Sequence, residues 1–146
     1  MSQLTVLLIE DNLRDVRLTQ RAFVQASLTH NLRVVRDGDE ALAYLYREGE
    51  YKDPSSAPRP DVILLDLTLP RMGGHEVLRR LKLDPRFKSV PIIVLTTSGR
   101  PDDVRQAYEE GANAYLLKPV EFARFTEMLE RFGKFWFETI ELPPEA

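Results

Sequence analysis

Four apolar segments of the chain end on residues whose side chains could bind a metal ion or a phosphate group. In chain order these residues are Glu10, Asp11, Asp66, Thr96, Thr97 and Lys118. Carboxylates are common ligands of Mg²⁺, and hydroxyl and ammonium groups hydrogen-bond phosphate oxygens. If the four segments end side by side, the sequence predicts a magnesium-dependent acceptor of a phosphoryl group.

The apolar segments have the length and composition of buried parallel strands, because they are rich in Val, Ile and Leu and alternate with helical patterns. We expect strands at residues 4–9, 32–35, 62–66, 92–96 and 114–117. We expect helices at about 15–26, from 39 to near 49, at about 75–83, from 101 to 111 and from about 121 toward 137, with a surface loop at 50–60. Ligands bind at the carboxyl edge of such sheets, so the six residues should face one crevice.

The alternation of strands and helices predicts an α/β fold with helices on both faces of an open parallel sheet. A closed barrel would need about eight strand–helix units, and this chain offers roughly five. The 146 residues suit a single domain, residues 1–146.

Composition excludes several classes of function. Lys and Arg number 20 against 23 Asp and Glu, a net charge of −3, so the chain lacks the basic surplus typical of nucleic-acid binding. There is no Cys for a disulfide or a thiolate metal site. The N-terminus does not resemble a signal peptide, and no apolar run approaches the ~18 residues of a membrane span. We expect a cytoplasmic protein.

The order of these motifs, an acidic pair, a single Asp, a Thr and a Lys-Pro, resembles the receiver domain of two-component response regulators. The resemblance covers about residues 4–130 and implies a doubly wound, five-stranded parallel sheet in the order 2-1-3-4-5. That order makes Glu10, Asp11 and Asp66 neighbours. Their mutual repulsion is on the order of several kcal/mol, which a divalent cation would relieve.

The resemblance also implies a role for each residue. Asp66 is the phosphoacceptor, and Mg²⁺ is held by Asp11, Asp66, the carbonyl of Thr68 and, through water, Glu10. Thr96, Thr97 and Lys118 bind the phosphoryl oxygens, Thr96 and Tyr115 form a conformational switch, and the peptide bond before Pro119 is cis. The donor is a phosphohistidine of a sensor histidine kinase. Such a protein is not a conventional enzyme, because it catalyses only its own phosphorylation and dephosphorylation.

Two positions depart from the common receiver pattern. Gly73 and Gly74 stand where many receivers have Asp-Gly, and Thr68 replaces a frequent Asn. Neither change removes a group that the site needs, although Thr68 leaves the rate of hydrolysis open.

Three other classes of protein share part of this pattern. A haloacid-dehalogenase-type phosphatase needs a second Asp two positions after its nucleophile, where this chain has Thr68. An FMN-binding flavodoxin-like protein needs a neutral phosphate loop after the first strand, where this chain is acidic. A pseudo-receiver, which binds partners without phosphorylation, is the alternative that stays open, because it shares the fold.

A narrower resemblance concerns the segment 49–61, the strand end LTTS and the aromatic tail FGKFWFETIELP. These look like the small single-domain regulators paired with bacterial and cyanobacterial phytochromes, which implies a phytochrome-type kinase as partner. Residues 131–146 would form an aromatic C-terminal extension. Its apolar stripe exceeds what packing on the sheet needs, which favours a homodimer. The expected interface residues are Phe122, Phe132, Phe135 and Trp136.

The two histidines, His30 and His75, have no second nitrogen ligand at metal spacing. We expect both to lie on the solvated surface.

Overall fold

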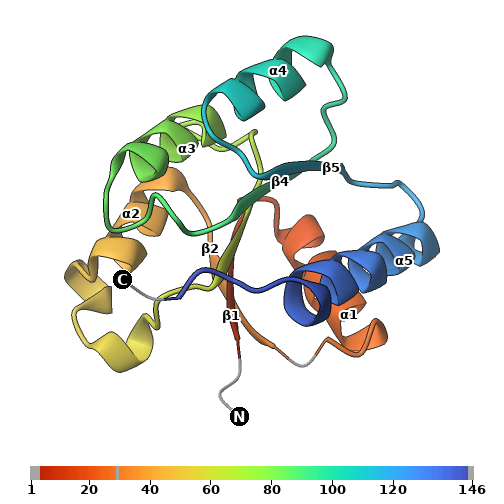
Figure 1. Ribbon diagram of the computed structural model, residues 1–146, viewed down its shortest axis with the longest axis horizontal. Helices are drawn as coiled ribbons and strands as arrows, with labels where there is room; N and C mark the ends of the chain where they lie inside the picture. Colours follow the sequence, from red (N-terminus) through yellow and green to blue (C-terminus); the bar gives the residue numbers. More distant parts are fainter. Residues whose placement is uncertain (1–3, 29, 145–146) are drawn as a thin grey trace.

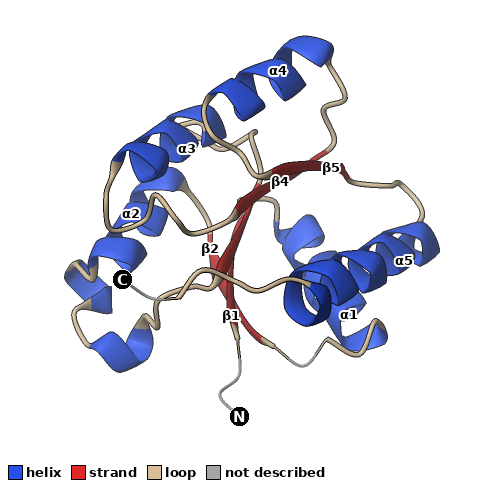
Figure 2. Ribbon diagram, viewed as in Figure 1, coloured by secondary structure: helices blue, strands red, loops and turns tan. Residues whose placement is uncertain are grey.

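A five-stranded parallel sheet forms the centre of the computed structural model, which describes residues 4–28 and 30–144 (Figure 2). The strands are β1 (Thr5–Ile9), β2 (Asn31–Val35), β3 (Val62–Leu65), β4 (Ile92–Thr96) and β5 (Ala114–Leu117). Their order across the sheet is β2-β1-β3-β4-β5, and all four pairings are parallel. The predicted fold class and strand order are therefore confirmed.

Five helices cover the two faces of the sheet (Figure 1). They are α1 (Leu13–Gln25), α2 (Gly38–Tyr46), α3 (Gly74–Leu83), α4 (Pro101–Glu109) and α5 (Phe122–Gly133). Helices α1 and α5 pack together on one face, and α2, α3 and α4 lie on the other. None of the helices in residues 4–28 and 30–144 is long and apolar enough to cross a membrane.

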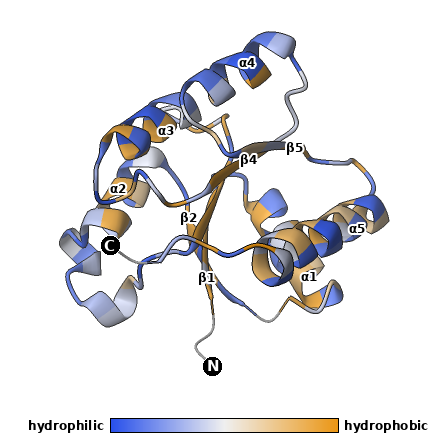
Figure 3. Ribbon diagram, in the orientation of Figure 1, coloured by the Kyte–Doolittle hydropathy of each residue, from blue (hydrophilic) through white to orange (hydrophobic). Residues whose placement is uncertain are grey.

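The core consists of two apolar layers that share the strands. Alternate residues of β1, for example Leu7 and Ile9, face α2, α3 and α4, whereas Val6 and Leu8 face α1 and α5. Both sets are buried because parallel strands are covered on both faces, so the central strands are apolar along their length (Figure 3).

Local signals explain where the helices begin. The side chain of Asn12 accepts a hydrogen bond from the backbone N–H of Asp15, which caps α1 and starts it two residues earlier than expected. Asp37 caps α2 in the same way through the N–H of Glu40. Pro101 begins α4, where its missing N–H costs no hydrogen bond.

The connection between α2 and β3 contains two short 3₁₀ turns, η1 (Gly49–Tyr51) and η2 (Pro54–Ser56), which the expectation of a plain loop missed. Asp53 accepts a hydrogen bond from the N–H of Ser55 at the start of η2. Ala57 is buried, and the hydroxyl of Tyr44 donates to the carbonyl of Pro58 at 2.7 Å. The segment is therefore anchored to the core.

The end of the chain departs from the predicted continuous α-helix. Helix α5 ends at Gly133, and residues Lys134–Thr139 continue as a π-helical segment, η3. In an α-helix, consecutive side chains point about 100° apart. Trp136 and Phe137 nevertheless pack against the same core layer, and the wider π turn accommodates both.

Candidate functional site

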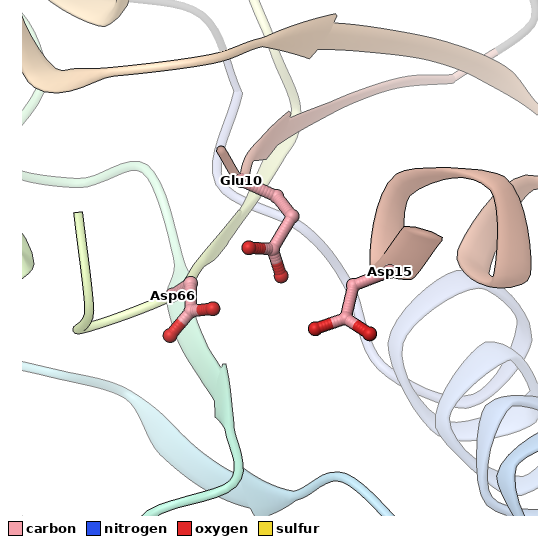
Figure 4. A group of neighbouring side chains, drawn as sticks. All are labelled: Glu10, Asp15 and Asp66. Atoms are coloured by element: carbon pink, nitrogen blue, oxygen red, sulfur yellow. The ribbon is translucent and has the colours of Figure 1, made fainter. Parts of the chain in front are cut away.

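The carboxyl edge of the sheet brings together side chains from four elements. Glu10 follows β1, Asp66 follows β3, Lys118 follows β5, and Asp15 lies in the first turn of α1. Carboxylate oxygens of Glu10, Asp15 and Asp66 lie within 4.8 Å of one another (Figure 4). The predicted convergence of Glu10, Asp66 and Lys118 is confirmed, and Asp15 joins them.

Lys118 lies at the centre of this carboxylate cluster. Its Nζ donates hydrogen bonds to Asp66 at 3.0 Å, to Asp15 at 3.1 Å and to Glu10. Its side chain is only 7% exposed. Burial alone would lower the pKa of Lys118, but the hydrogen bond to Glu10 and the charge of Asp66 outweigh it and raise the pKa above its ordinary value. Lys118 is therefore a buried, permanently charged ammonium.

The two buried carboxyl groups differ in their affinity for protons. Burial, followed by the hydrogen bond with Asp66, raises the pKa of Glu10 to about 7. Burial also tends to raise the pKa of Asp66, but hydrogen bonds from Glu10, Lys118 and the Thr68 N–H, with the Lys118 charge, hold it below its usual value. Asp66 is the group of the pair that stays ionised at neutral pH, as a nucleophile must.

Three residues predicted for the site lie at its rim. The carboxylate of Asp11 is not part of the cluster in the described chain, and its backbone carbonyl accepts hydrogen bonds from the Arg36 guanidinium at 2.9 and 3.3 Å. The backbone N–H of Thr68 donates to Asp66 Oδ1 at 3.0 Å, and the Thr68 side chain is exposed. Thr97, after β4, is also exposed.

Thr96 is buried at the end of β4, with 1% of its surface exposed. Its hydroxyl oxygen has no hydrogen-bond partner among the residues that the structure describes. A buried hydroxyl without a partner carries a desolvation cost, which an oxygen atom of a ligand could remove. Thr96 is therefore ready to donate to an anion at this edge.

Tyr115, on β5, is half-buried against the core layer of α2, α3 and α4. Its hydroxyl donates to the backbone carbonyl of Ser98 at 2.7 Å, which ties β5 to the loop between β4 and α4. The side chain of Ser98 in turn contacts Asp103 on α4. Any displacement of this loop is thus coupled to the tyrosine and to α4.

The prediction of a cis bond before Pro119 is wrong, because no peptide bond in the described residues is cis. For a bond before proline the intrinsic preference for trans is about 0.5–1 kcal/mol. Lys118 reaches all three carboxylates with a trans bond, so the geometry of the cluster supplies nothing to overcome that preference.

The prediction that the histidines are solvated is also wrong. His75, at the start of α3, is 21% exposed, and its Nδ1 lies 2.5 Å from Glu110 Oε1 at the end of α4. Its Nε2 is buried 3.8 Å from an Asp103 oxygen. His30 is half-buried, with its ring centroid 4.1 Å from that of Phe137. Both histidines therefore hold neighbouring elements together.

The donor set of the edge fits a divalent cation and a phosphoryl group together. Oxygen ligands from clustered carboxylates suit Mg²⁺ or Mn²⁺, whereas no thiolate or histidine in the cluster would favour a softer metal. The ammonium of Lys118 and the unpartnered hydroxyl of Thr96 suit the oxygens of a phosphoryl group. This combination is what transfer of a phosphoryl group to a carboxylate requires.

The response regulator receiver domain is the family whose model matches residues 6–130. The chain belongs to this family. It is 42% identical over 138 residues to the response regulator Rcp1 of Synechocystis sp.. The matched region covers 94% of this chain and 92% of Rcp1.

Solved receiver structures match almost the whole chain. One is the crystal structure of the phosphorylated cyanobacterial phytochrome response regulator RcpA, with a TM-score of 0.89, 40% identity, and coverage of 98% of this chain and 100% of that one. Another is the Mn(2+)-bound form of Rcp1, with a TM-score of 0.86, 41% identity, and coverage of 96% and 99%. The resemblance to single-domain phytochrome response regulators, inferred from segment 49–61, the strand end LTTS and the aromatic tail, is confirmed.

Asp15 is the site residue that the sequence analysis missed. Its only signal was an acidic residue in the first turn of a helix, which is common because it complements the helix dipole. In the folded chain the Asp15 carboxylate nevertheless lies near those of Glu10 and Asp66 (Figure 4), and one of its oxygens is 3.1 Å from Lys118 Nζ.

Proposed function

We propose that this chain is a stand-alone response regulator, a single receiver domain that accepts a phosphoryl group on Asp66 in a Mg²⁺-dependent reaction. The donor is a sensor histidine kinase, and the names of the similar proteins support a phytochrome-type kinase. The observation that carries the proposal is the contact between the buried Lys118 ammonium and Asp66, next to the unpartnered hydroxyl of Thr96.

Asp66 acts as the nucleophile. Its Oδ1 accepts the Thr68 N–H, which fixes the carboxylate, and its low pKa keeps it ionised. A carboxylate oxygen attacks the phosphorus of the donor phosphohistidine, a new O–P bond forms, and the N–P bond breaks with its electron pair returning to the imidazole. The product is an acyl phosphate on Asp66 and a free histidine on the kinase.

The other residues balance the charge of the transferred group. Lys118 binds one phosphoryl oxygen, and the Thr96 hydroxyl with the Thr97 backbone N–H binds another. Glu10, Asp11, Asp66 and the carbonyl of Thr68 are the groups that would hold Mg²⁺. The ion, when bound, supplies positive charge that offsets the clustered carboxylates and the phosphoryl oxygens.

Signalling follows from the movement of Thr96 toward the phosphoryl group. That movement displaces the loop between β4 and α4, to which the hydroxyl of Tyr115 is hydrogen-bonded through Ser98. The face formed by α4, β5 and α5 then repacks. We propose that this face and the aromatic extension carry a homodimer contact.

One predicted interface residue needs correction. Phe132 is 5% exposed and packs inside the core layer of α1 and α5, so it supports the extension from within its own chain. Phe135 is 51% exposed, and Phe122 and Trp136 are half-buried. These three are the residues that we propose for the contact.

The pseudo-receiver is the second candidate, and no observation in the site favours it, because acceptor, lysine and threonine are all in place. Incubation with acetyl phosphate and Mg²⁺ followed by intact-mass measurement separates the two. We expect one added phosphate on the parent and none on Asp66→Asn, whose amide is nearly isosteric with the carboxylate. An unmodified parent with a native fold would favour the pseudo-receiver.

A further inference from the structure

The hydrogen-bonding capacity of Lys118 is fully used within its own chain. A lysine ammonium has three N–H donors and no acceptor. In this structure Nζ contacts three carboxylates, on Glu10, Asp15 and Asp66. A phosphoryl oxygen can therefore be bound by Lys118 only if one of these carboxylates gives up its hydrogen bond.

Asp15 is the partner most easily released. The side chains of Glu10 and Asp66 are 1% and 8% exposed, whereas that of Asp15 is 28% exposed. Glu10 and Asp66 are also held at strand ends inside the sheet, while Asp15 projects from the first turn of α1. Water can replace the lost contact at Asp15 more readily than at the two buried groups.

The structure also provides a place for the Asp15 carboxylate to move into. A cavity of about 170 Å³ lies between α1 and the loops after β4 and β5, and Asp15, Lys118 and Thr97 contribute to its walls. Arg14 lines the same cavity, so a cation is close to a displaced carboxylate. Release of Asp15 from Lys118 therefore needs no rearrangement of the core.

We propose that the Asp15 carboxylate, in the unphosphorylated protein, accepts the hydrogen bond from Lys118 that a phosphoryl oxygen accepts after phosphorylation. The incoming phosphoryl oxygen displaces the Asp15 carboxylate from Lys118. This inference rests on the proposed function and adds a positioning residue to it. Asp15 acts through Lys118 and does not itself touch the reacting atoms.

Two effects of opposite sign follow from the charge of Asp15. Its carboxylate, within 4.8 Å of those of Glu10 and Asp66, strengthens the attraction for a divalent cation. The same charge repels a phosphoryl group, and its hydrogen bond competes for Lys118. Asp15→Asn should therefore weaken binding of Mg²⁺ to the unphosphorylated protein and strengthen binding of a phosphoryl mimic.

The test measures both affinities on the full chain. Mg²⁺ is titrated alone, and beryllofluoride is then titrated at saturating Mg²⁺, with the backbone amide signals of Asp66 and Thr96 followed by NMR. For Asp15→Asn we expect about a threefold or larger loss of Mg²⁺ affinity and about a threefold or larger gain for beryllofluoride, as for one unit charge removed at contact distance in a water-like medium. Asp15→Glu, which keeps the charge, should restore both toward the parent values.

Asp102→Asn is the matched control. Asp102 also lies in the first turn of a helix, α4, is 81% exposed and pairs only with Arg105 in the described chain. The Asp102→Asn substitution makes the same change in net charge at a residue that does not contact Lys118. The affinities for Mg²⁺ and for beryllofluoride should therefore stay at the parent values.

A readout on Lys118 itself excludes a merely structural role. The ammonium N–H signals of a lysine held by three carboxylates exchange slowly with water, and in Asp15→Asn they should exchange faster while the fold and the melting temperature are kept. Equal affinities for Asp15→Asn and Asp102→Asn, or two affinities that move in the same direction, would overturn the inference while leaving the proposed function standing. A parent that binds no beryllofluoride would overturn both.

Discussion

At the scale of single residues, the charge of the site is balanced by Lys118. One buried ammonium offsets the cluster of Glu10, Asp15 and Asp66, and the burial of Lys118, Glu10 and Asp66 strengthens the interactions among these three groups. Removing one partner from such a cluster leaves uncompensated charge, which typically costs about 3–5 kcal/mol. We therefore expect the lysine to be needed for stability, in addition to its proposed role in binding a phosphoryl group.

Lys118→Met should destabilise the metal-free protein by about 3 kcal/mol at pH 8. The loss should shrink at pH 5, because Glu10, whose pKa is already raised to about 7, then carries a proton. A group with a raised folded-state pKa stabilises the fold below its unfolded pKa, and that contribution is lost as the pH rises through the folded value. The variant should thus lose stability between about pH 5 and pH 8.

Urea unfolding at the two pH values measures this difference. Lys88→Met, at an exposed lysine that makes no ion pair in the described residues, is the control and should change little at either pH. A loss for Lys118→Met that is the same at pH 5 and pH 8 would argue against charge compensation.

Most site residues were predictable because strand ends leave a clear signal. Glu10, Asp66, Thr96 and Lys118 each lie at the end of an apolar run, and parallel strands align those ends. Asp15 could not be found this way, because a first-turn carboxylate looks the same whether it caps a helix or faces a site. The peptide isomer before Pro119 was equally inaccessible, since it depends on an energy difference of about 0.5–1 kcal/mol.

At the scale of elements, the start of α3 is packed directly against the end of β3. A Cβ atom at Gly74 would lie 2.4 Å from the carbonyl oxygen of Asp66 and 2.5 Å from Cα of Leu67. Only glycine allows α3 to approach so closely, and the approach fixes the backbone of Asp66, the proposed phosphoacceptor. The same glycine thus serves both packing and the site.

Gly74→Ala should destabilise the protein by about 1–3 kcal/mol, because overpacked backbone cannot relax freely. It should also shift the amide signals of Asp66 and Thr68 in NMR spectra. The matched control is Gly73→Ser, since no atom lies within 4 Å of a Cβ at Gly73, the capping residue of α3. If the melting temperatures of Gly74→Ala and Gly73→Ser fell by the same amount, close packing at Gly74 would not be the cause.

The C-terminal extension is held partly by the contact between His30 and Phe137, whose ring centroids are 4.1 Å apart. Burial lowers the pKa of His30, with a smaller opposing effect from Glu138. A histidine with a lowered pKa favours the fold in its neutral form. Its contribution is therefore complete above the unfolded value of about 6.5 and is lost as the pH falls below it.

Phe137→Ala should consequently raise the pKa of His30 toward its ordinary value, which an NMR titration of the imidazole would measure. Between pH 7 and pH 5 the melting temperature of the parent should fall by more than that of Phe137→Ala. Trp136→Ala, at the neighbouring position that does not stack on His30, serves as the comparison. An unchanged His30 titration in Phe137→Ala would show that the aromatic contact does not bury the imidazole.

The extension shows why some elements could not be predicted. The apolar residues from Phe122 to Phe137 favoured a continuous α-helix with one broad stripe. In the structure, residues 134–139 widen to a π-helix, which moves Trp136 and Phe137 onto the core and leaves Phe135 outside. Local periodicity does not record a change in helix type that tertiary packing imposes.

At the scale of the whole molecule, exposed apolar side chains occur on α4, on β5, in the loop after β5 and in η3, after α5. Leu117 is 52% exposed, Val120 is 100% exposed and Phe135 is 51% exposed. Tyr108, at the end of α4, is 49% exposed. Exposed apolar side chains favour association, and Tyr115 of the proposed switch lies on β5, one of the elements that carry them.

Phe135→Glu should weaken self-association at least tenfold, because a charge would replace an exposed aromatic anchor of the proposed contact. Beryllofluoride should tighten association of the parent by about tenfold, equivalent to about 1.4 kcal/mol. Sedimentation velocity over a range of concentrations measures both effects. Leu83→Glu, at an 83% exposed apolar residue on α3, should leave association unchanged. Equal sedimentation of parent and Phe135→Glu would locate the contact elsewhere.

We expect Asp66, and none of the carboxylates around it, to receive the phosphoryl group. Reduction of the phosphorylated protein with borohydride converts an aspartyl phosphate to homoserine, and peptide mapping by mass spectrometry then identifies the residue. Homoserine should appear at position 66 alone, and only when a divalent cation is present. Homoserine at position 11 or 15, or a phosphorylated protein without homoserine, would rule out Asp66 as the acceptor.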